Sequence, residues 1–229
     1  MTVTDACVQL ANVGEVIASL PQVLRSDAEE NRHRILESAR QLFSESGLDV
    51  TMRQIARRAE VGPATLYRRF PSKQDLVLEA FKSELAACRA IVREGVANTD
   101  PWQGFCSVVE RITVLNARNQ GFTDAFLSVH ASAADFASHR VDMLSEVATI
   151  IRRAQAVGAL RQDFVVDDFV LILLAGRGLG RAPLEVRSVA AHRFAALAID
   201  GLRASRSTGQ LPPPARLSSA ARDFSLDRV

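Results

Sequence analysis

Length, composition and charge place the chain among folded globular proteins. It has 229 residues, of which 48% are apolar and 24% are charged, and its formal net charge at pH 7 is +2. This apolar content is enough for a sizeable core, and it excludes a disordered acidic or basic tail protein. The length fits one large domain or two small ones.

The cysteines and the hydropathy pattern indicate a reducing compartment. Cys7, Cys88 and Cys106 are odd in number, widely spaced and without a C-x-x-C pair, which argues against a disulfide framework or a zinc site. A redox-sensor role for one of them stays open, but a buried small side chain is the simpler interpretation. No apolar run reaches the roughly 18 residues of a membrane span, and the first residues lack the pattern of a secretory signal. We therefore expect a cytoplasmic protein with no membrane partner.

Two short helices with clear end signals are predicted at the start of residues 32–73. In the first, apolar residues from Ile35 to Phe43 recur on one face, and Gly47 supplies a left-handed stop. Thr51 and Gln54 then have the spacing of a capping box, which predicts the start of a second helix only about two turns long.

A third helix is predicted from Pro63 to Phe70, after a break at residues 60–62. Proline is tolerated at a first helical position, and two helices joined by a tight turn with glycine make a helix-turn-helix. Leu66 and Phe70 should point into a small core. The outward residues are then Ala64, Thr65, Arg68 and Arg69, with Tyr67 at the flank. This face carries donors and no acid, which suits contact with base edges and phosphates.

A phosphate site is predicted directly after the third helix. Pro71 ends that helix, and Ser72 with Asp75 has the spacing of a cap on a fourth. Lys73 then lies beside free backbone N–H groups at a helix N-terminus, an arrangement that attracts phosphate. Residues 32–73 hold nine Lys or Arg against four acids, a surplus of five positive charges where the whole chain has +2. The basic charge is therefore concentrated on the helix-turn-helix.

The segment from Thr51 to Phe81, TMRQIARRAEVGPATLYRRFPSKQDLVLEAF, resembles the DNA-binding segment of the tetracycline-repressor (TetR) family of bacterial transcription regulators. The preceding ILESARQLFSESG matches the first helix of that family, and T-L-Y, Phe70 and the S-K at 72–73 fall at its spacing. The resemblance covers roughly 50 residues well and the rest in outline. It implies binding to double-stranded DNA, with Arg53 where family members reach the groove. The candidate DNA contacts are Arg53, Pro63, Ala64, Thr65, Tyr67, Arg68, Arg69 and Lys73.

The rest of the chain is also predicted to be helical, which makes the fold all-α. A single rigid helix from 73 to about 96 is expected to join the head to the body. Further helices are expected at 102–118, 122–130, 135–157, 166–176 and 185–203, since apolar stripes recur at helical spacing and no period-two alternation appears. The expected domains are an N-terminal extension (1–25), a helix-turn-helix DNA-binding domain (26–73), a helical effector-binding and dimerisation domain (74–205) and a disordered tail rich in Pro and Ser (206–229).

The N-terminal extension offers little to interpret. Its apolar residues have no clean helical period, and no Lys or Arg precedes Arg25. A mobile segment is the simplest interpretation, and a partner-binding segment or an arm in the minor groove of DNA is the less favoured alternative.

No convergent catalytic set can be assembled, so we expect neither enzyme activity nor a cofactor. Asp135 and His139 are four residues apart with His130 nearby, and they could in principle touch a metal, but a solvated pair is the simpler interpretation. The GRGLGR run at 176–181 lacks the strand that precedes a phosphate-binding loop. We predict no metal site.

The body could instead enclose an apolar pocket. Its candidate lining residues are Trp102, Phe105, Val109, Phe122, Phe126, Met143, Phe169 and Leu173, with His130, Asn116 and Arg177 as polar groups that orient a ligand. These side chains could equally fill the core. The resemblance favours a pocket, for a small apolar or amphipathic effector.

Two heads should act together, because one helix-turn-helix reads only a few base pairs. The expected homodimer seam on the last two long helices is Phe169, Ala190, Phe194, Leu197 and Gly201. The predicted function is repression from a palindromic operator, with release by the effector. The alternative is a helical adaptor whose head binds protein, and the Arg and Thr on the third helix favour DNA.

Overall fold

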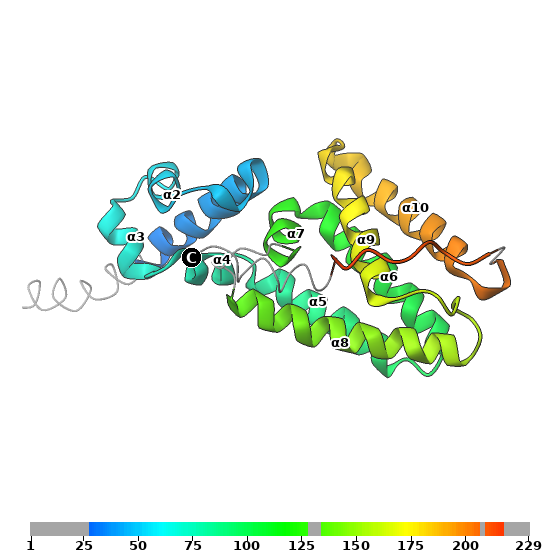
Figure 1. Ribbon diagram of the computed structural model, residues 1–229. Coiled ribbons are helices and arrows are strands. Elements are labelled where there is room, and N and C mark those ends of the chain that lie inside the picture. The colour runs from blue at the N-terminus through cyan, green and yellow to red at the C-terminus, as the bar shows by residue number, and fades with distance from the viewer. Residues whose placement is uncertain (1–27, 128–133, 207–208, 218–229) are drawn as a thin grey trace, which may run out of the picture.

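The computed structural model describes residues 28–127, 134–206 and 209–217 (Figure 1). After a first helix over residues 28–46, the described elements are η1 (Gly47–Asp49), α2 (Met52–Arg58), α3 (Pro63–Arg69), α4 (Lys73–Ala80), α5 (Lys82–Ala97), α6 (Pro101–Arg118), α7 (Gln120–Leu127), α8 (Ala134–Ala156), α9 (Val166–Gly176), η3 (Arg177–Arg181), α10 (Leu184–Leu202) and η4 (Ala204–Arg206). These ranges contain no strand, so the predicted all-α class is confirmed. None of the described helices has the length and apolar character needed to cross a membrane.

The helices form a small head and a larger body (Figure 1). The head contains the first helix, α2 and α3, and α4 leads from it into the body. Within the body, α6 is central and packs against α5, α8, α9 and α10. The helices α5 and α8 lie side by side, while α9 and α10 cover another part of α6.

Local side-chain caps fix the helix starts of the head, as predicted. The hydroxyl of Thr51 accepts from the backbone N–H of Gln54 at 3.3 Å, and the side-chain oxygen of Gln54 accepts from the N–H of Thr51 at 2.7 Å. Ser72 and Asp75 make the same reciprocal pair at the start of α4, at 3.1 and 3.0 Å. Gly47 adopts φ 70°, the left-handed stop expected for the first helix. Caps of this kind contribute about 0.5–2 kcal/mol each.

The predicted single helix from 73 to about 96 is wrong, since the chain bends at Phe81. This residue separates α4 from α5 with φ −112° and ψ 18°, values outside the helical region. Its ring is fully buried between the rings of Phe43 and Phe122, with centroid distances of 5.9 Å to each. Burial of the ring therefore accounts for a bend at a point where the sequence has neither proline nor glycine.

One apolar core runs through both the head and the body. The buried residues form a continuous cluster from the first helix to α9. Four aromatic rings in a row connect the core of the head to that of the body. The ring of Phe43 contacts that of Phe81, which contacts that of Phe122, and the ring centroid of Phe126 lies 5.8 Å from that of Phe122. Gly121 permits this approach, since a Cβ there would lie 3.0 Å from the backbone carbon of Phe43. The predicted border between the DNA-binding domain and the effector-binding domain, at the start of α4, thus does not coincide with a break in the core.

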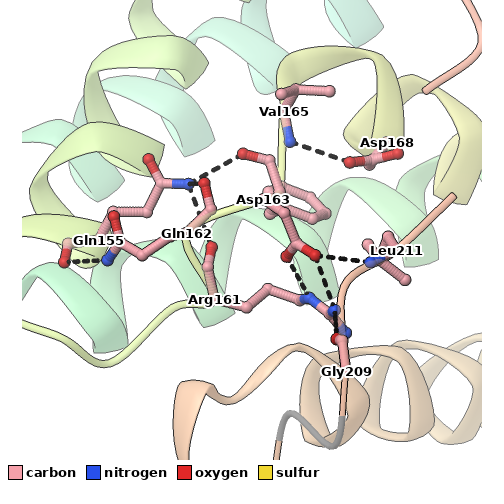
Figure 2. Close-up of polar contacts among 9 residues, drawn as sticks. Gln155, Arg161, Gln162, Asp163, Val165, Asp168, Gly209 and Leu211 are labelled. Atoms are coloured by element: carbon pink, nitrogen blue, oxygen red, sulfur yellow. Dashed lines mark hydrogen bonds and ion pairs between the residues drawn. The ribbon is translucent and has the colours of Figure 1, made fainter. Parts of the chain in front are cut away.

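Within the C-terminal tail that is predicted to be disordered, the structure describes residues 209–217, and these contact the body. Arg161 donates to the carbonyl oxygen of Gly209 at 2.9 Å, and the N–H of Leu211 donates to Asp163 at 2.7 Å (Figure 2). Hydrogen bonds from Arg161 and from the Leu211 backbone hold the pKa of Asp163 well below its usual range. Composition could not reveal this attachment, because its partners lie 48 residues apart. Arg206, the first residue of the predicted tail, ends η4, while residues 207–208 and 218–229 and the N-terminal extension lie outside the described residues.

Candidate nucleic-acid interface and internal cavity

The turn between α2 and α3 sets the direction of the third helix. Glu60 adopts φ 54°, and the N–H of Val61 donates to the carbonyl oxygen of Ala56 at 3.0 Å, which closes the C-terminus of α2. Gly62 then caps α3 and Pro63 occupies its first turn. The N-terminus of α3 is exposed as a result.

The helix α3 buries its apolar face and turns a polar face to solvent. Leu66 and Phe70 are buried, as predicted. Of the candidate DNA contacts, Arg53, Pro63, Ala64, Tyr67, Arg68 and Arg69 are exposed and Thr65 is half-buried. A helix with small residues at its start and arginines beyond them can enter the major groove.

Two acids of the head pair with arginines outside α3. Glu79 pairs with Arg32 at 2.6 Å, and Glu45 pairs with Arg58 at 3.1 Å. In the described part of the head, the cations without an ion pair or side-chain hydrogen bond are Arg53, Arg57, Arg68 and Arg69. The positive charge of the head therefore remains available on the side that carries α3, where it can attract phosphates.

The side chain of Lys73 contacts another part of the head, whereas the sequence predicted a lysine that is free to bind phosphate. Its ammonium donates to the carbonyl oxygen of Leu48 in η1. Burial lowers the pKa of Lys73, while the nearby Asp49 acts in the opposite direction. A phosphate at the N-terminus of α4 would have to share this lysine with Leu48. The contact joins residues 25 positions apart, so local spacing could not reveal it.

Six of the predicted pocket residues meet around one small cavity in the body. It has a volume of about 10 Å³ and lies between α5, α6, α7, α8 and α9. Its lining residues are Cys88, Ile112, Asn116, Phe122, Phe126, Met143, Leu144, Phe169 and Leu173. Of these, Cys88, Ile112 and Leu144 were absent from the predicted set, although each lies on an apolar stripe of its helix.

The other predicted pocket residues lie elsewhere. Trp102 stacks on Phe105 at a centroid distance of 5.7 Å, near the start of α6. Val109 is buried outside the cavity lining, Arg177 is exposed in η3, and His130 lies outside the described residues. A helix rises about 1.5 Å per residue, so residues on one apolar stripe of a long helix such as α6 lie far apart along its axis. They therefore contact different parts of the core.

The two described thiols are unsuited to redox sensing. Burial raises the pKa of Cys88 to about 12 and that of Cys106 to about 11. Because the thiolate is the reactive form, both side chains are inert near neutral pH. Cys7 lies outside the described residues. In the described ranges, no group of three or more His, Cys, Asp or Glu is placed to hold a metal ion.

The expected dimer residues divide into an inner and an outer set. Phe169 is only 2% exposed and lines the cavity, and a ring carbon of Phe194 lies 3.6 Å from where a Cβ of Gly176 would be. Leu197 is 65% exposed, Gly201 is exposed and Ala190 is half-buried. Further exposed apolar residues of these two helices are Leu171 on α9 and Val186 and Val189 on α10. Periodicity alone could not tell which face of α10 meets α9.

Comparison with known protein families agrees with this architecture. Residues 35–80 match the family described as bacterial regulatory proteins, tetR family, and residues 100–204 match the C-terminal domain of SbtR-like transcriptional regulators. The chain belongs to the TetR family. The predicted resemblance is thus confirmed, and TetR proteins are DNA-binding transcription regulators and not enzymes.

Individual TetR proteins are similar over much of the chain. The transcriptional repressor KstR of Mycobacterium tuberculosis is 33% identical over 144 residues, which cover 61% of this chain and 66% of KstR. KstR of Mycolicibacterium smegmatis is 36% identical over 123 residues, covering 51% and 60%. These matches span two thirds or less of the relatives. A TetR crystal structure from Streptomyces coelicolor A3, SCO3833, has the same fold, with a TM-score of 0.61 at 20% identity over 74% of this chain and 90% of that one.

Proposed function

We propose that this TetR protein represses transcription as a homodimer on a palindromic operator and that a small effector releases it. The observation that carries the proposal is the face of α3, where Arg68 and Arg69 are exposed and have no ion pair among the described residues. The name of the KstR relatives supports repression as the sign of regulation. An adaptor role is less well supported, because Tyr67 is the one large apolar side chain exposed in the described part of the head.

The interface residues divide into base contacts and phosphate contacts. Arg53, Thr65 and Arg68 are our candidates for base edges, since arginine can bind guanine with two hydrogen bonds. Tyr67, Arg69 and Lys73 are candidates for phosphates, and Pro63 and Ala64 allow close approach of the helix start. Base contacts should set sequence preference, and phosphate contacts should set affinity for all duplexes.

The proposed dimer seam lies on the exposed apolar side of α9 and α10. Of the seam residues predicted from the sequence, we keep the exposed Leu197 and Gly201. We add the exposed apolar residues Val186, Val189 and Leu171. Both helices from each protomer would form a four-helix interface, which removes these side chains from water. Phe169 and Phe194 support this surface from inside.

Selection of duplexes from a random pool tests DNA recognition. We expect enrichment of a two-fold symmetric sequence, with half-sites one helical turn or a multiple of it apart. The logarithm of the binding constant should fall linearly with the logarithm of salt concentration. Lys73→Ala should weaken selected and random duplexes alike. A pool without any enriched sequence, together with binding that is insensitive to salt, would contradict the proposal.

The substitution Leu197→Asp tests the dimer. It places a charge in the seam, and an unpaired buried charge costs several kcal/mol, so the variant should sediment as a monomer and lose operator binding. The matched control is Val141→Asp, which changes a residue of similar exposure on α8 and should stay dimeric. A wild-type chain that sediments as a monomer at micromolar concentration and still binds a half-site tightly would show the dimer proposal to be wrong.

A further inference from the structure

Among the described residues, one polar side chain of the cavity has no side-chain hydrogen bond. Asn116 on α6 is 6% exposed, and its amide makes no side-chain hydrogen bond among the described residues. Thr113, one turn earlier, is also buried, but its hydroxyl donates to the carbonyl oxygen of Val109 at 2.7 Å. The same helix therefore satisfies one buried polar side chain and leaves the other facing the cavity.

A buried water molecule would have the least possible room and few partners beside the amide of Asn116. A water site needs roughly 10–15 Å³ of room and two to four polar partners. The cavity offers about 10 Å³, and apart from the thiol of Cys88 the other lining side chains are apolar. An amide left unpaired in such surroundings loses the hydrogen bonds that it made to water, and most native proteins avoid this.

We propose that Asn116 recognises the effector, and that the effector is a neutral, largely apolar molecule with one carbonyl or hydroxyl oxygen for this amide. The proposal rests on the proposed function, because it defines the chemistry of the molecule that releases the regulator. The cavity has no charged side chain in its lining, so a carboxylate or an ammonium group would lose its hydration without gaining a counter-charge. Ring or chain carbon suits the remaining walls.

Met143 is the natural entrance to the cavity. It lines the cavity and also an open groove of about 490 Å³ on the outside of the body, beside Arg89 and His139. A methionine side chain has three rotatable bonds and adapts its shape readily. The ligand enters by displacing Met143, and the cavity expands around it.

Phe122 connects an occupied cavity to the DNA-binding head. Its ring lines the cavity and lies 5.9 Å from the ring of Phe81, which lies 5.9 Å from that of Phe43 in the first helix. Phe81 is also the point at which α4 and α5 separate. A ligand that moves Phe122 therefore changes the packing that holds the head.

The neutral fluorophore Prodan, a naphthalene with one ketone, tests the proposal with the full chain. We expect saturable binding, with emission to the blue of Prodan in water because the cavity is apolar, and to the red of Prodan bound to Asn116→Leu because the amide donates to the ketone. Asn116→Leu should weaken Prodan about tenfold, the loss of one hydrogen bond, and leave the deoxy analogue with a propyl group unaffected. The same variant should unfold about 2–4 °C higher, because it removes an unpaired buried amide. The matched control Thr113→Val should keep its affinity for Prodan.

Three results would overturn the proposal. These are the absence of saturable Prodan binding, an equal loss for both probes in Asn116→Leu, and a less stable or unfolded Asn116→Leu, which would show that the amide supports the fold. Leu144→Trp is the second variant, since it fills the cavity from a half-buried position and should abolish binding of both probes. DNA binding by the wild-type chain without a probe is measured separately, so failure of the regulator proposal is distinguishable from failure of the ligand proposal.

Discussion

The polar groups proposed to bind DNA and the effector lie in opposite places, at the surface of the head and in the core of the body. On the head, Arg68 and Arg69 face solvent without an ion pair among the described residues. In the body, the amide of Asn116 lies in the core without a side-chain hydrogen bond among the described residues, while Val189 and Leu197 are exposed. DNA offers its phosphates from outside, so a surface that binds it must present charge to water. An apolar ligand binds by leaving water, so the group that orients it must be inside.

The strongest test of this contrast is Phe81→Ala, because Phe81 packs on both regions. Removing a fully buried phenylalanine costs about 3–5 kcal/mol of stability, and here the loss falls on the contact between head and body. We expect thermal unfolding to split into two transitions, followed by circular dichroism and calorimetry. Tyr67→Ala is the control, since it removes an exposed aromatic and should change the stability by less than about 0.5 kcal/mol. A single transition at the wild-type temperature in Phe81→Ala would show that the two regions do not depend on this ring.

The next test separates the two kinds of arginine on the head. Arg68→Ala should cost about 1–3 kcal/mol on the selected operator and relax the preference at one base position. Arg58 is paired with Glu45, so Arg58→Ala should leave that preference unchanged. Both are measured by fluorescence anisotropy on single-base operator variants. Equal losses on random DNA would reassign Arg68 to a phosphate.

A smaller effect is expected at the turn of the helix-turn-helix. Glu60 is a non-glycine residue with φ 54°, a conformation that costs other residues about 1–2 kcal/mol. Glu60→Gly should relieve this strain, and after the entropy of glycine is subtracted it should raise the free energy of unfolding by up to about 1 kcal/mol. Urea denaturation measures the change. Loss of stability would mean that the Glu60 side chain supports the turn.

The smallest effect concerns acid stability of the body. The pKa of Asp163 is depressed in the folded chain, so its stabilising effect is present above the unfolded pKa of about 3.9 and is lost as pH falls through the lower folded value. Between these two values the melting temperature of the wild type should fall more steeply with acid than that of Asp163→Asn. The comparison is made by thermal melts between pH 5 and 2, a range suggested by these limits. Identical profiles would show that the link to Arg161 does not contribute.

The sequence by itself determined the parts of the head that depend on near neighbours. The capping pairs of Thr51 with Gln54 and of Ser72 with Asp75 join residues three apart, so their spacing predicts their geometry. Helical periodicity likewise placed Leu66 in the core. The family-specific spacing in this region then carried the resemblance to DNA-binding regulators.

The tertiary structure decided what depends on residues that are distant in the sequence. Spacing showed an apolar stripe on each body helix, but not that Phe169 lines a cavity while Phe105 packs elsewhere. The bend at Phe81 follows from rings on two other helices, and the unpaired state of Asn116 follows from what five helices place around it. Near neighbours in the sequence fix where a helix begins and which side is apolar, and only the packed fold decides what that side meets.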